Sequence, residues 1–265
     1  MPAHNTRQET SVSQNGRREL AQLFYDYFDL IPADNMALQR EVYAIRYQVY
    51  CEHLQFESVE NNPNCLEYDE HDRFSNHCLL QHKATGCYVG CVRVIHKRDT
   101  DLLPFETLLG ERKSTITGSY SEISRLAILP KYTRTERKKT AAAHDFEERQ
   151  LLPYISLGLI LAGAACVLRS GNQCSFATME PRLARLLTRL GVHCEPISGL
   201  VEHHGHRAVY IIYPVQRHKA PDPMIETMLQ HTVKAIQKAN FVHPDSTGNT
   251  LPTQHKTHPN LSSIR

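Results

Sequence analysis

The stretch Ser119–Pro130 (SYSEISRLAILP) constrains the fold of this chain more than any other. It is rich in strand-favouring residues, and its closing proline holds the preceding residue extended, so it predicts a β-strand. Because side chains alternate along a strand, one face is expected to carry Glu122, Ser124, Leu126 and Ile128, and the other Ile123, Arg125, Ala127 and Leu129. Both faces bear apolar side chains, which places the strand in the middle of a sheet.

Two charged residues, Glu122 and Arg125, lie within this predicted strand. A charge buried without a partner is costly, so each side chain requires an opposite charge or a solvent-filled cleft. One interpretation is a structural ion pair, and the other is a functional site. The strand alone supports the two interpretations about equally.

The length of 265 residues is sufficient for a full core, and we expect one domain at 19–240 between disordered tails at 1–18 and 241–265. The formal net charge of +2 implies no general attraction to nucleic acid or membranes. The eight cysteines lack the spacing of a disulfide scaffold and are interpreted as reduced thiols.

The apolar run 155–168 is shorter than the roughly 20 residues that span a bilayer. It predicts a buried helix, and the polar N-terminus favours a cytoplasmic protein.

Hydrophobic periodicity predicts alternating strands and helices along the domain. The predicted strands are 23–31, 77–82, 87–96, 122–129, 173–179, 192–197 and 206–213. The predicted helices are 36–53, 153–169, 181–190 and 224–239, with a loop or short helix at 101–112. Residues 55–74 are polar and form a long loop, which is either a functional lid or a solvated acidic segment.

Arg46 and Tyr50 lie one turn apart on the predicted helix 36–53, so they can face one ligand or one acid together. A surface arginine stacked on a tyrosine is the simpler alternative. Arg93 lies on the same strand face as Cys91 and Ile95, so an otherwise apolar face carries one charge that demands an acidic partner. Gly90, inside this strand, predicts a bulge or the close approach of another backbone.

The acidic loop contains Asp69 and Asp72, for which two roles compete. The two carboxylates either neutralise nearby arginines or receive a cationic amine substrate. The first role needs only local charge neutralisation and is favoured. The arginines available for such pairs are Arg46, Arg93 and Arg125.

The segment Glu122–Leu126 (EISRL) resembles the signature strand of the acyl-homoserine-lactone synthases. Other pieces of that pattern precede this segment, in the same order as in the family. They are Arg46-x-x-x-Tyr50, Phe56, Asp69-Glu70-His71-Asp72, Gly90-Cys91-Val92-Arg93 and Pro104-Phe105. Tyr50 and Phe56 stand where that pattern has Phe and Trp. From about Tyr27 to Pro214 the chain is also similar to a related group, the acyltransferases associated with the exosortase (PEP-CTERM) sorting system.

The resemblance implies an α/β (α+β) GNAT-like fold: a mixed, mostly antiparallel sheet flanked by helices, with a V-shaped split between central strands. It implies an acyltransferase that moves an acyl group from a thioester to an amine, with Glu122 as the catalytic base. Ser124 would bind the donor or its thiol, and Phe105 is either a lining residue or an ordinary core aromatic. The implied substrate-binding residues are Arg46, Tyr50, Phe56, Asp69, Asp72, Arg93, Phe105, Ser124 and Arg125.

The donor is suggested by a basic run after the central strand. GNAT enzymes typically have a glycine-rich loop here that holds the pyrophosphate of coenzyme A. This sequence has no glycine between Lys131 and Gly158, which favours a donor carried on acyl carrier protein, whose acidic surface would meet the basic run. A solvated basic loop is the alternative. The implied docking residues are Lys131, Arg134, Arg137, Lys138 and Lys139.

Two other functions are compatible with the same residues. The first is an acyl-homoserine-lactone synthase that uses S-adenosylmethionine, although the chain is long for that family and Phe56 replaces the tryptophan. The second is a GNAT-like module that binds acyl carrier protein without catalysis. We expect no metal and no tightly bound cofactor, because the sixteen histidines and eight cysteines show no CxxC or HExxH spacing. The histidines 203, 204 and 206 are interpreted as a solvated turn.

Overall fold

The computed structural model describes residues 14–98, 101–111, 116, 118–133, 146–213 and 222–241. One eight-stranded sheet runs in the order β1-β2-β3-β4-β5-β8-β6, with β7 also paired to β8. The strands are β1 (Phe28–Pro32), β2 (Ser75–His82), β3 (Tyr88–His96), β4 (Tyr120–Ile128), β5 (Cys174–Met179), β6 (Cys194–Pro196), β7 (Val201–Glu202) and β8 (His206–Ile212). Only β4 and β5 are parallel, so the predicted mixed, mostly antiparallel sheet is confirmed.

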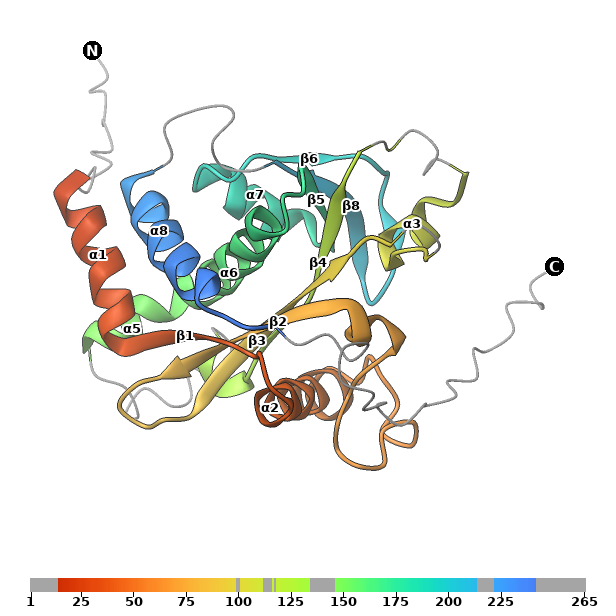
Figure 1. The fold of residues 1–265 in the computed structure, drawn as a ribbon, viewed down its shortest axis with the longest axis horizontal. Helices are drawn as coiled ribbons and strands as arrows, with labels where there is room; N and C mark the ends of the chain where they lie inside the picture. The colour runs from red at the N-terminus through yellow and green to blue at the C-terminus, as the bar shows by residue number, and fades with distance from the viewer. Residues whose placement is uncertain are drawn as a thin grey trace, which may run out of the picture.

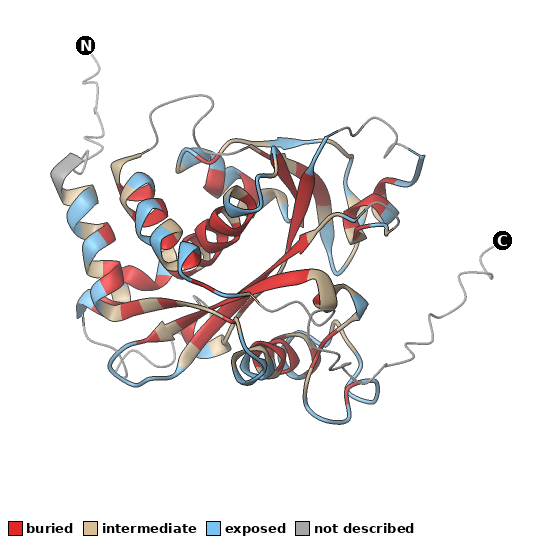
Figure 2. Cartoon of the chain, in the orientation of Figure 1, coloured by how far each residue is buried: buried red, intermediate tan, exposed pale blue. Residues whose placement is uncertain are grey.

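Helices cover both faces of the sheet (Figure 1). They are α1 (Gln14–Tyr27), α2 (Met36–Arg46), η1 (Tyr47–His53), η2 (Glu70–Phe74), α3 (Pro104–Leu109), η4 (Pro130–Tyr132), α5 (Phe146–Leu151), η5 (Leu152–Tyr154), α6 (Ile155–Arg169), α7 (Pro181–Arg189) and α8 (Pro223–Gln237). The main core lies under α1, α6 and α8, and a second apolar cluster lies under α2 on the opposite face. Figure 2 shows that α6 is buried almost throughout.

The apolar stretch that includes α6 is a core helix. The segment Phe146–Arg169 is long and apolar enough to cross a membrane, but 72% of its apolar window is buried inside the protein. The helix packs on β2, β3 and β4 and against α8. The prediction of a buried helix in this region is confirmed.

The N-terminal part of the domain differs from the prediction. A strand was expected at 23–31, but α1 continues to Tyr27 and the strand β1 begins only at Phe28. Ala21, Phe24 and Tyr25 are buried in the main core, and this spacing is that of a helical stripe. Aromatic residues are enriched in strands and only tolerated in helices, so the local preference indicated a strand and tertiary packing produced the helix. The helix also begins at Gln14, within the segment 1–18 that the composition predicts to be a disordered tail.

The predicted helix 36–53 is present, in two parts. Asn35 caps α2 by accepting a hydrogen bond from the backbone N–H of Leu38 at 3.0 Å. After Arg46 the helix widens into the π-helix η1, which ends at His53. Such widened turns occur frequently at functional sites, and this one carries Tyr50.

The central strands β4 and β5 pair over a short distance only. Their register runs from Tyr120 opposite Cys174 to Glu122 opposite Phe176 and includes no later pair. Both strands continue beyond this point, β4 to Ile128 and β5 to Met179. The strands therefore part immediately after Glu122, which is the predicted V-shaped split.

A bulge in β4 changes which side chains share a face. Arg93 of β3 lies opposite Ser124, whereas Cys91 lies opposite Ala127, so β4 has an extra residue here. Arg125 has a φ of 49°, an unusual left-handed conformation for a residue other than glycine. Because the extra residue reverses the alternation, the predicted faces of β4 are wrong beyond Ser124. Leu126 and Ile128 pack on the main core with Ile123, and Ala127 packs under α2.

Candidate active site

A cavity of about 1160 Å³ lies at the split between β4 and β5. Its walls come from β3, β4, η1, η2, α3, α6, the end of β5, α7, β8 and the turn before β8. The V-shaped opening of the sheet thus provides a space large enough for a substrate.

Glu122 lies on the wall of this cavity and is only 2% exposed. Its carboxylate accepts a hydrogen bond from the backbone N–H of Phe105 at 3.1 Å. Burial raises the pKa of Glu122 to about 7. Among the described residues, no cationic side chain lies within ion-pair distance of Glu122. These residues therefore provide no structural ion pair for Glu122.

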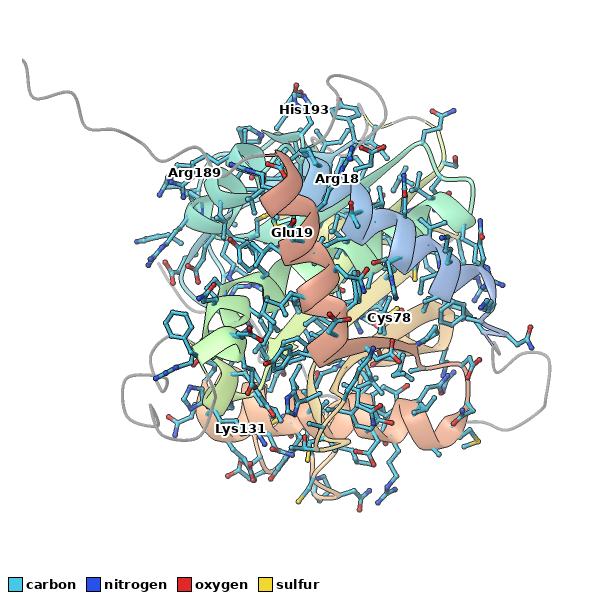
Figure 3. All side chains as sticks on the ribbon, turned by 90° about the vertical axis from the view of Figure 1, so that its left-hand side faces the viewer. Arg18, Glu19, Cys78, Lys131, Arg189 and His193 are labelled. Atoms are coloured by element: carbon cyan, nitrogen blue, oxygen red, sulfur yellow. The ribbon has the colours of Figure 1, made fainter. Side chains whose placement is uncertain are left out.

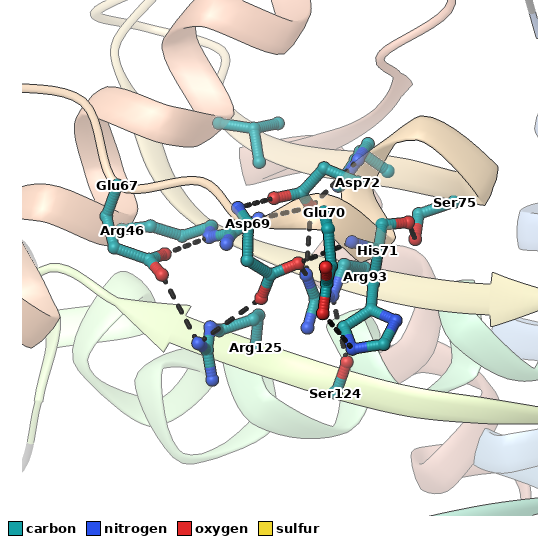
Figure 4. A network of polar contacts seen from close by, with 12 residues as sticks. Arg46, Glu67, Asp69, Glu70, His71, Asp72, Ser75, Arg93, Ser124 and Arg125 are labelled. Atoms are coloured by element: carbon teal, nitrogen blue, oxygen red, sulfur yellow. Dashed lines mark hydrogen bonds and ion pairs between the residues drawn. The ribbon is translucent and has the colours of Figure 1, made fainter. Parts of the chain in front are cut away.

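The opposite situation holds for a charge cluster of six residues: Arg46, Glu67, Asp69, Asp72, Arg93 and Arg125 (Figure 4). At its centre Arg46 of α2 donates from Nε to Glu67 at 2.5 Å and from Nη1 to Asp72 at 2.6 Å. These three side chains are fully buried. Burial alone would raise the pKa of Asp72, but Arg46 and Arg93 lower it to about 2.

The other two arginines connect the acidic loop to the sheet. Arg93 of β3 donates from Nη1 to Asp69 at 2.6 Å and to Asp72 at 3.0 Å, and from Nε to Ser124 at 3.0 Å. Arg125 of β4 lies 3.3 Å from Glu67 and 3.4 Å from Asp69. Burial acts to raise the pKa of Asp69, but Arg93 and Arg125 hold it well below its usual value.

Asp69 and Asp72 also organise the loop itself. The Asp69 side chain accepts from the N–H of His71 at 2.9 Å, and Asp72 accepts from the N–H of Asp69 at 2.7 Å, which caps η2. Neither carboxylate lines the cavity. Their position favours the role of ion-pair partners over that of amine receptors, and the cluster holds the loop 55–74 and α2 against β3 and β4.

The three aromatic residues expected at the site have different positions. Tyr50 lines the cavity and donates from its hydroxyl to the carbonyl of Leu126 at 2.9 Å. Phe56 also lines the cavity. Phe105 is fully buried and stacks on Phe176 with ring centroids 4.3 Å apart, outside the cavity lining. Its side chain is therefore a core aromatic, and its backbone serves the site through Glu122.

Sequence reasoning missed several residues of the site. Glu67, a member of the charge cluster, was only one acid among several in the loop. The turn before β8, interpreted as solvated, brings His204 onto the ring of Phe56 with centroids 4.6 Å apart. His203, His204 and Arg207 all line the cavity. The alternation along β8 could have placed Arg207 on the inner face, but nothing local indicated that Phe56 would meet this turn.

The basic run is only partly described. Lys131 is exposed, with its ammonium group 5.0 Å from the ring centre of Tyr132 (Figure 3). The other four predicted docking residues, at positions 134, 137, 138 and 139, lie outside the described residues. Among the described residues, no group of three or more His, Cys, Asp or Glu side chains is arranged to hold a metal ion.

Comparison with known proteins supports the class of enzyme. Residues 45–143 match the family model described as "Acetyltransferase (GNAT) domain". No curated protein matches the sequence. With the open sheet and its split, this match defines an acyltransferase of GNAT-like fold, which confirms the predicted fold class and type of enzyme.

Solved structures share this fold. TofI, solved in a ternary complex with an inhibitor and MTA, is 18% identical with a TM-score of 0.54, over 76% of this chain and 96% of TofI. The AHL synthase LasI is 18% identical with a TM-score of 0.50, over 75% of this chain and 92% of LasI. MesI, a CoA-dependent acyl-homoserine lactone synthase, is 20% identical with a TM-score of 0.50, over 77% of this chain and 94% of MesI.

Proposed function

We propose that this protein is an N-acyltransferase that moves a fatty acyl group from an acyl carrier protein thioester to the amine of a small metabolite or amino acid. The observation that carries the proposal is Glu122: a buried carboxylate without an ion pair among the described residues, at the point where β4 and β5 part, facing the cavity. Such a group fits the role of a general base near neutral pH.

In the proposed reaction the amine attacks the thioester carbonyl while Glu122, directly or through water, takes its proton. A C–N bond forms, the C–S bond breaks, and the thiol of the donor leaves with a proton. Beyond Glu122 and Phe176, β4 and β5 are no longer paired with each other, so backbone N–H groups at the split are available to polarise the carbonyl.

The apolar part of the cavity wall suits an acyl chain. It includes Ile160 of α6 and Leu183 and Leu187 of α7. Burial of each methylene of the chain there contributes roughly 0.8 kcal/mol of binding. The charge cluster, by contrast, is proposed to hold the lid formed by the loop 55–74, with Ser124, Arg93 and Arg125 at the boundary between lid and cavity.

The choice of donor rests on the sequence. Between Lys131 and Gly158 there is no glycine for a pyrophosphate loop, and the run Lys131–Lys139 is basic, which together favour acyl carrier protein over coenzyme A. MesI, which shares the fold, is a CoA-dependent enzyme, so the fold itself is compatible with coenzyme A and the preference for acyl carrier protein is carried by the sequence alone. Association with an exosortase (PEP-CTERM) system and a cytoplasmic location stay predictions from the sequence. All eight cysteines are free thiols, which agrees with a reducing compartment.

The second candidate function is an acyl-homoserine-lactone synthase that uses S-adenosylmethionine, which the shared fold of LasI and MesI favours. One experiment separates the two. Purified protein is incubated with acyl carrier protein or coenzyme A loaded with different chains, with pooled amines or with S-adenosylmethionine, and products are identified by mass spectrometry. N-acyl products from the amines, lost in Glu122→Gln, support the proposal. An acyl-homoserine lactone formed only with S-adenosylmethionine supports the alternative, and no acylated product with either donor contradicts both.

A further inference from the structure

Three polar side chains follow one another across the cavity face of β4, β5 and β8. Glu122 lies opposite Phe176, and two residues further along β5 Thr178 lies opposite Val209 of β8. Residues that lie opposite each other on neighbouring strands share a face of a sheet, and so do residues two positions apart on one strand. Glu122, Thr178 and Val209 therefore share one face, and Arg207, two residues before Val209, lies on this face too. The three strands are neighbours in the sheet (Figure 1). Glu122, Thr178 and Arg207 all line the cavity.

Thr178 and Arg207 are incompletely satisfied. The Oγ1 of Thr178 and the Nε of Arg207 are buried, and neither has a hydrogen-bond partner. Within the described ranges no carboxylate lies within ion-pair distance of Arg207, whose guanidinium is 5.8 Å from the ring centre of Phe56. Three other arginines that line the cavity do have acids: Arg93 has Asp69 at 2.6 Å, Arg98 has Asp101 at 3.8 Å, and Arg125 has Glu57 at 3.0 Å. Unsatisfied buried donors cost stability, which a ligand can restore.

A carboxylate is the ligand that these groups fit. A guanidinium binds a carboxylate through parallel N–H donors, and a hydroxyl adds one further donor. Thr178 lies on the strand next to that of Glu122 and two residues beyond the partner of Glu122, Phe176. In a regular sheet the Cα atoms of two residues so related are about 8 Å apart. The parting of β4 and β5 increases this distance. A molecule whose amine and carboxylate are close together can therefore place the amine at Glu122 and the carboxylate at Thr178 and Arg207.

We propose that Thr178 and Arg207 bind the carboxylate of the acceptor, so that the acceptor is an amino acid and not a simple amine. The proposal rests on the proposed function, because it assigns the acceptor of the same reaction. It also gives a reason for two buried polar atoms in the cavity wall, the Oγ1 of Thr178 and the Nε of Arg207, that have no hydrogen-bond partner.

The experiment compares each of the common amino acids with its own decarboxylated amine, for example phenylalanine with phenethylamine. Binding is measured by calorimetry, and turnover with acyl carrier protein donors by mass spectrometry. We expect the wild type to prefer an amino acid, and Arg207→Gln to lower its kcat/KM and affinity about 10–100-fold, as for a lost charged hydrogen bond. Thr178→Val should have a smaller effect in the same direction. Neither change should affect the decarboxylated amine.

Arg98→Gln is the matched control, because it removes a cavity-lining arginine that has an acid partner, and it should leave the preference unchanged. Equal binding of amino acids and amines by the wild type would overturn the proposal. So would an Arg207→Gln variant that loses turnover of both equally, since the arginine would then serve the donor. Selective binding of an amino acid that needs Arg207, without any acyl transfer, would uphold the carboxylate site and contradict the proposed function alone.

Discussion

Glu122 and Asp72 are both buried carboxylates, yet their surroundings shift their pKa values in opposite directions. Asp72 accepts hydrogen bonds from Arg46 and Arg93, which lower its pKa to about 2 despite burial. Glu122 receives one backbone hydrogen bond, and burial raises its pKa to about 7. Asp72 is therefore ionised at all pH values of interest, whereas Glu122 gains and loses its proton near neutrality.

The first prediction concerns catalysis by Glu122. Glu122→Gln keeps the shape of the side chain but removes its ability to accept a proton, so kcat should fall by about 10²–10⁴-fold. Wild-type activity should rise with pH through about 7, because only ionised Glu122 acts as a base, and the variant should lose this rise. Steady-state kinetics across pH measure both effects. An unchanged pH profile in the folded variant would assign the base to another group or to water.

The second prediction concerns stability. Folding raises the pKa of Glu122 from 4.5 to about 7, so the folded protein holds the proton more tightly. This tighter binding of the proton stabilises the folded state fully below about pH 4.5, and the contribution is lost as the pH rises through about 7. Glu122→Gln has no charge to bury, so at about pH 8 it should be more stable than the wild type by up to about 3 kcal/mol. Urea denaturation at about pH 4 and pH 8 tests this, and equal stability differences at both would contradict it.

The third prediction concerns the charge cluster. Arg93→Ala leaves Asp69 and Asp72 short of a buried partner and should cost roughly 3–5 kcal/mol of unfolding free energy. Arg98→Ala, which removes a half-exposed pair with Asp101, should cost at most about 1 kcal/mol. Denaturation of the two variants gives the comparison. Equal, small losses would mean that the cluster contributes little to stability.

At the level of elements, β3 and β4 are held close together at the bulge. A Cβ added at Gly90 would lie 2.6 Å from the carbonyl oxygen of Ala127 and 3.0 Å from Leu159 of α6. The predicted close approach of another backbone at Gly90 is thus confirmed. Because this contact adjoins the extra residue in β4, Gly90 also helps to position Ser124 and Arg125 relative to Arg93.

The fourth prediction follows from this contact. Gly90→Ala should destabilise the protein by roughly 1–3 kcal/mol, since the backbone of β4 or the helix α6 must move. Gly199→Ala is the control, because a Cβ there has no neighbour within 4 Å. Thermal unfolding measures both. A neutral Gly90→Ala would show that the sheet relaxes easily at the bulge.

Most elements were predictable because their signals are local. The hairpin of β2 and β3, the central position of β4 and the burial of α6 follow from periodicity and turn residues. The bulge was not predictable, because the extra residue at Arg125 is defined by its pairing with β3 and leaves no mark on the sequence of β4. The helix α1 was misassigned because its aromatic residues favour a strand until they are packed.

At the scale of the whole molecule, the site combines segments that are far apart in the sequence. The charges of Arg46, Asp69, Asp72, Arg93 and Arg125 could be matched in advance, because buried opposite charges must find one another. The contribution of β8 could not, because the stacking of His204 on Phe56 depends on how the lid closes over the sheet. The resemblance motifs ended before β8 and gave no indication of Arg207.

The last prediction concerns the carrier protein. The run Lys131–Lys139 has five basic residues and follows directly on the central strand β4 in the sequence, the strand that parts from β5 after Glu122. Lys131 is exposed, as a docking residue must be. An acidic carrier should be attracted to this run, and the attraction should weaken with salt because exposed charges are screened over about 10 Å at 0.1 M ionic strength.

Charge reversal tests this docking site. Replacing Arg134, Arg137 and Lys138 by glutamate should raise KM for acyl carrier protein and make it less dependent on salt, while turnover of acyl-coenzyme A stays nearly unchanged. Arg182, exposed on α7, offers a reversal elsewhere on the surface as the control. Equal losses with both donors would mean that the run supports the fold or the chemistry, and a KM that ignores both salt and charge reversal would place the carrier on another surface.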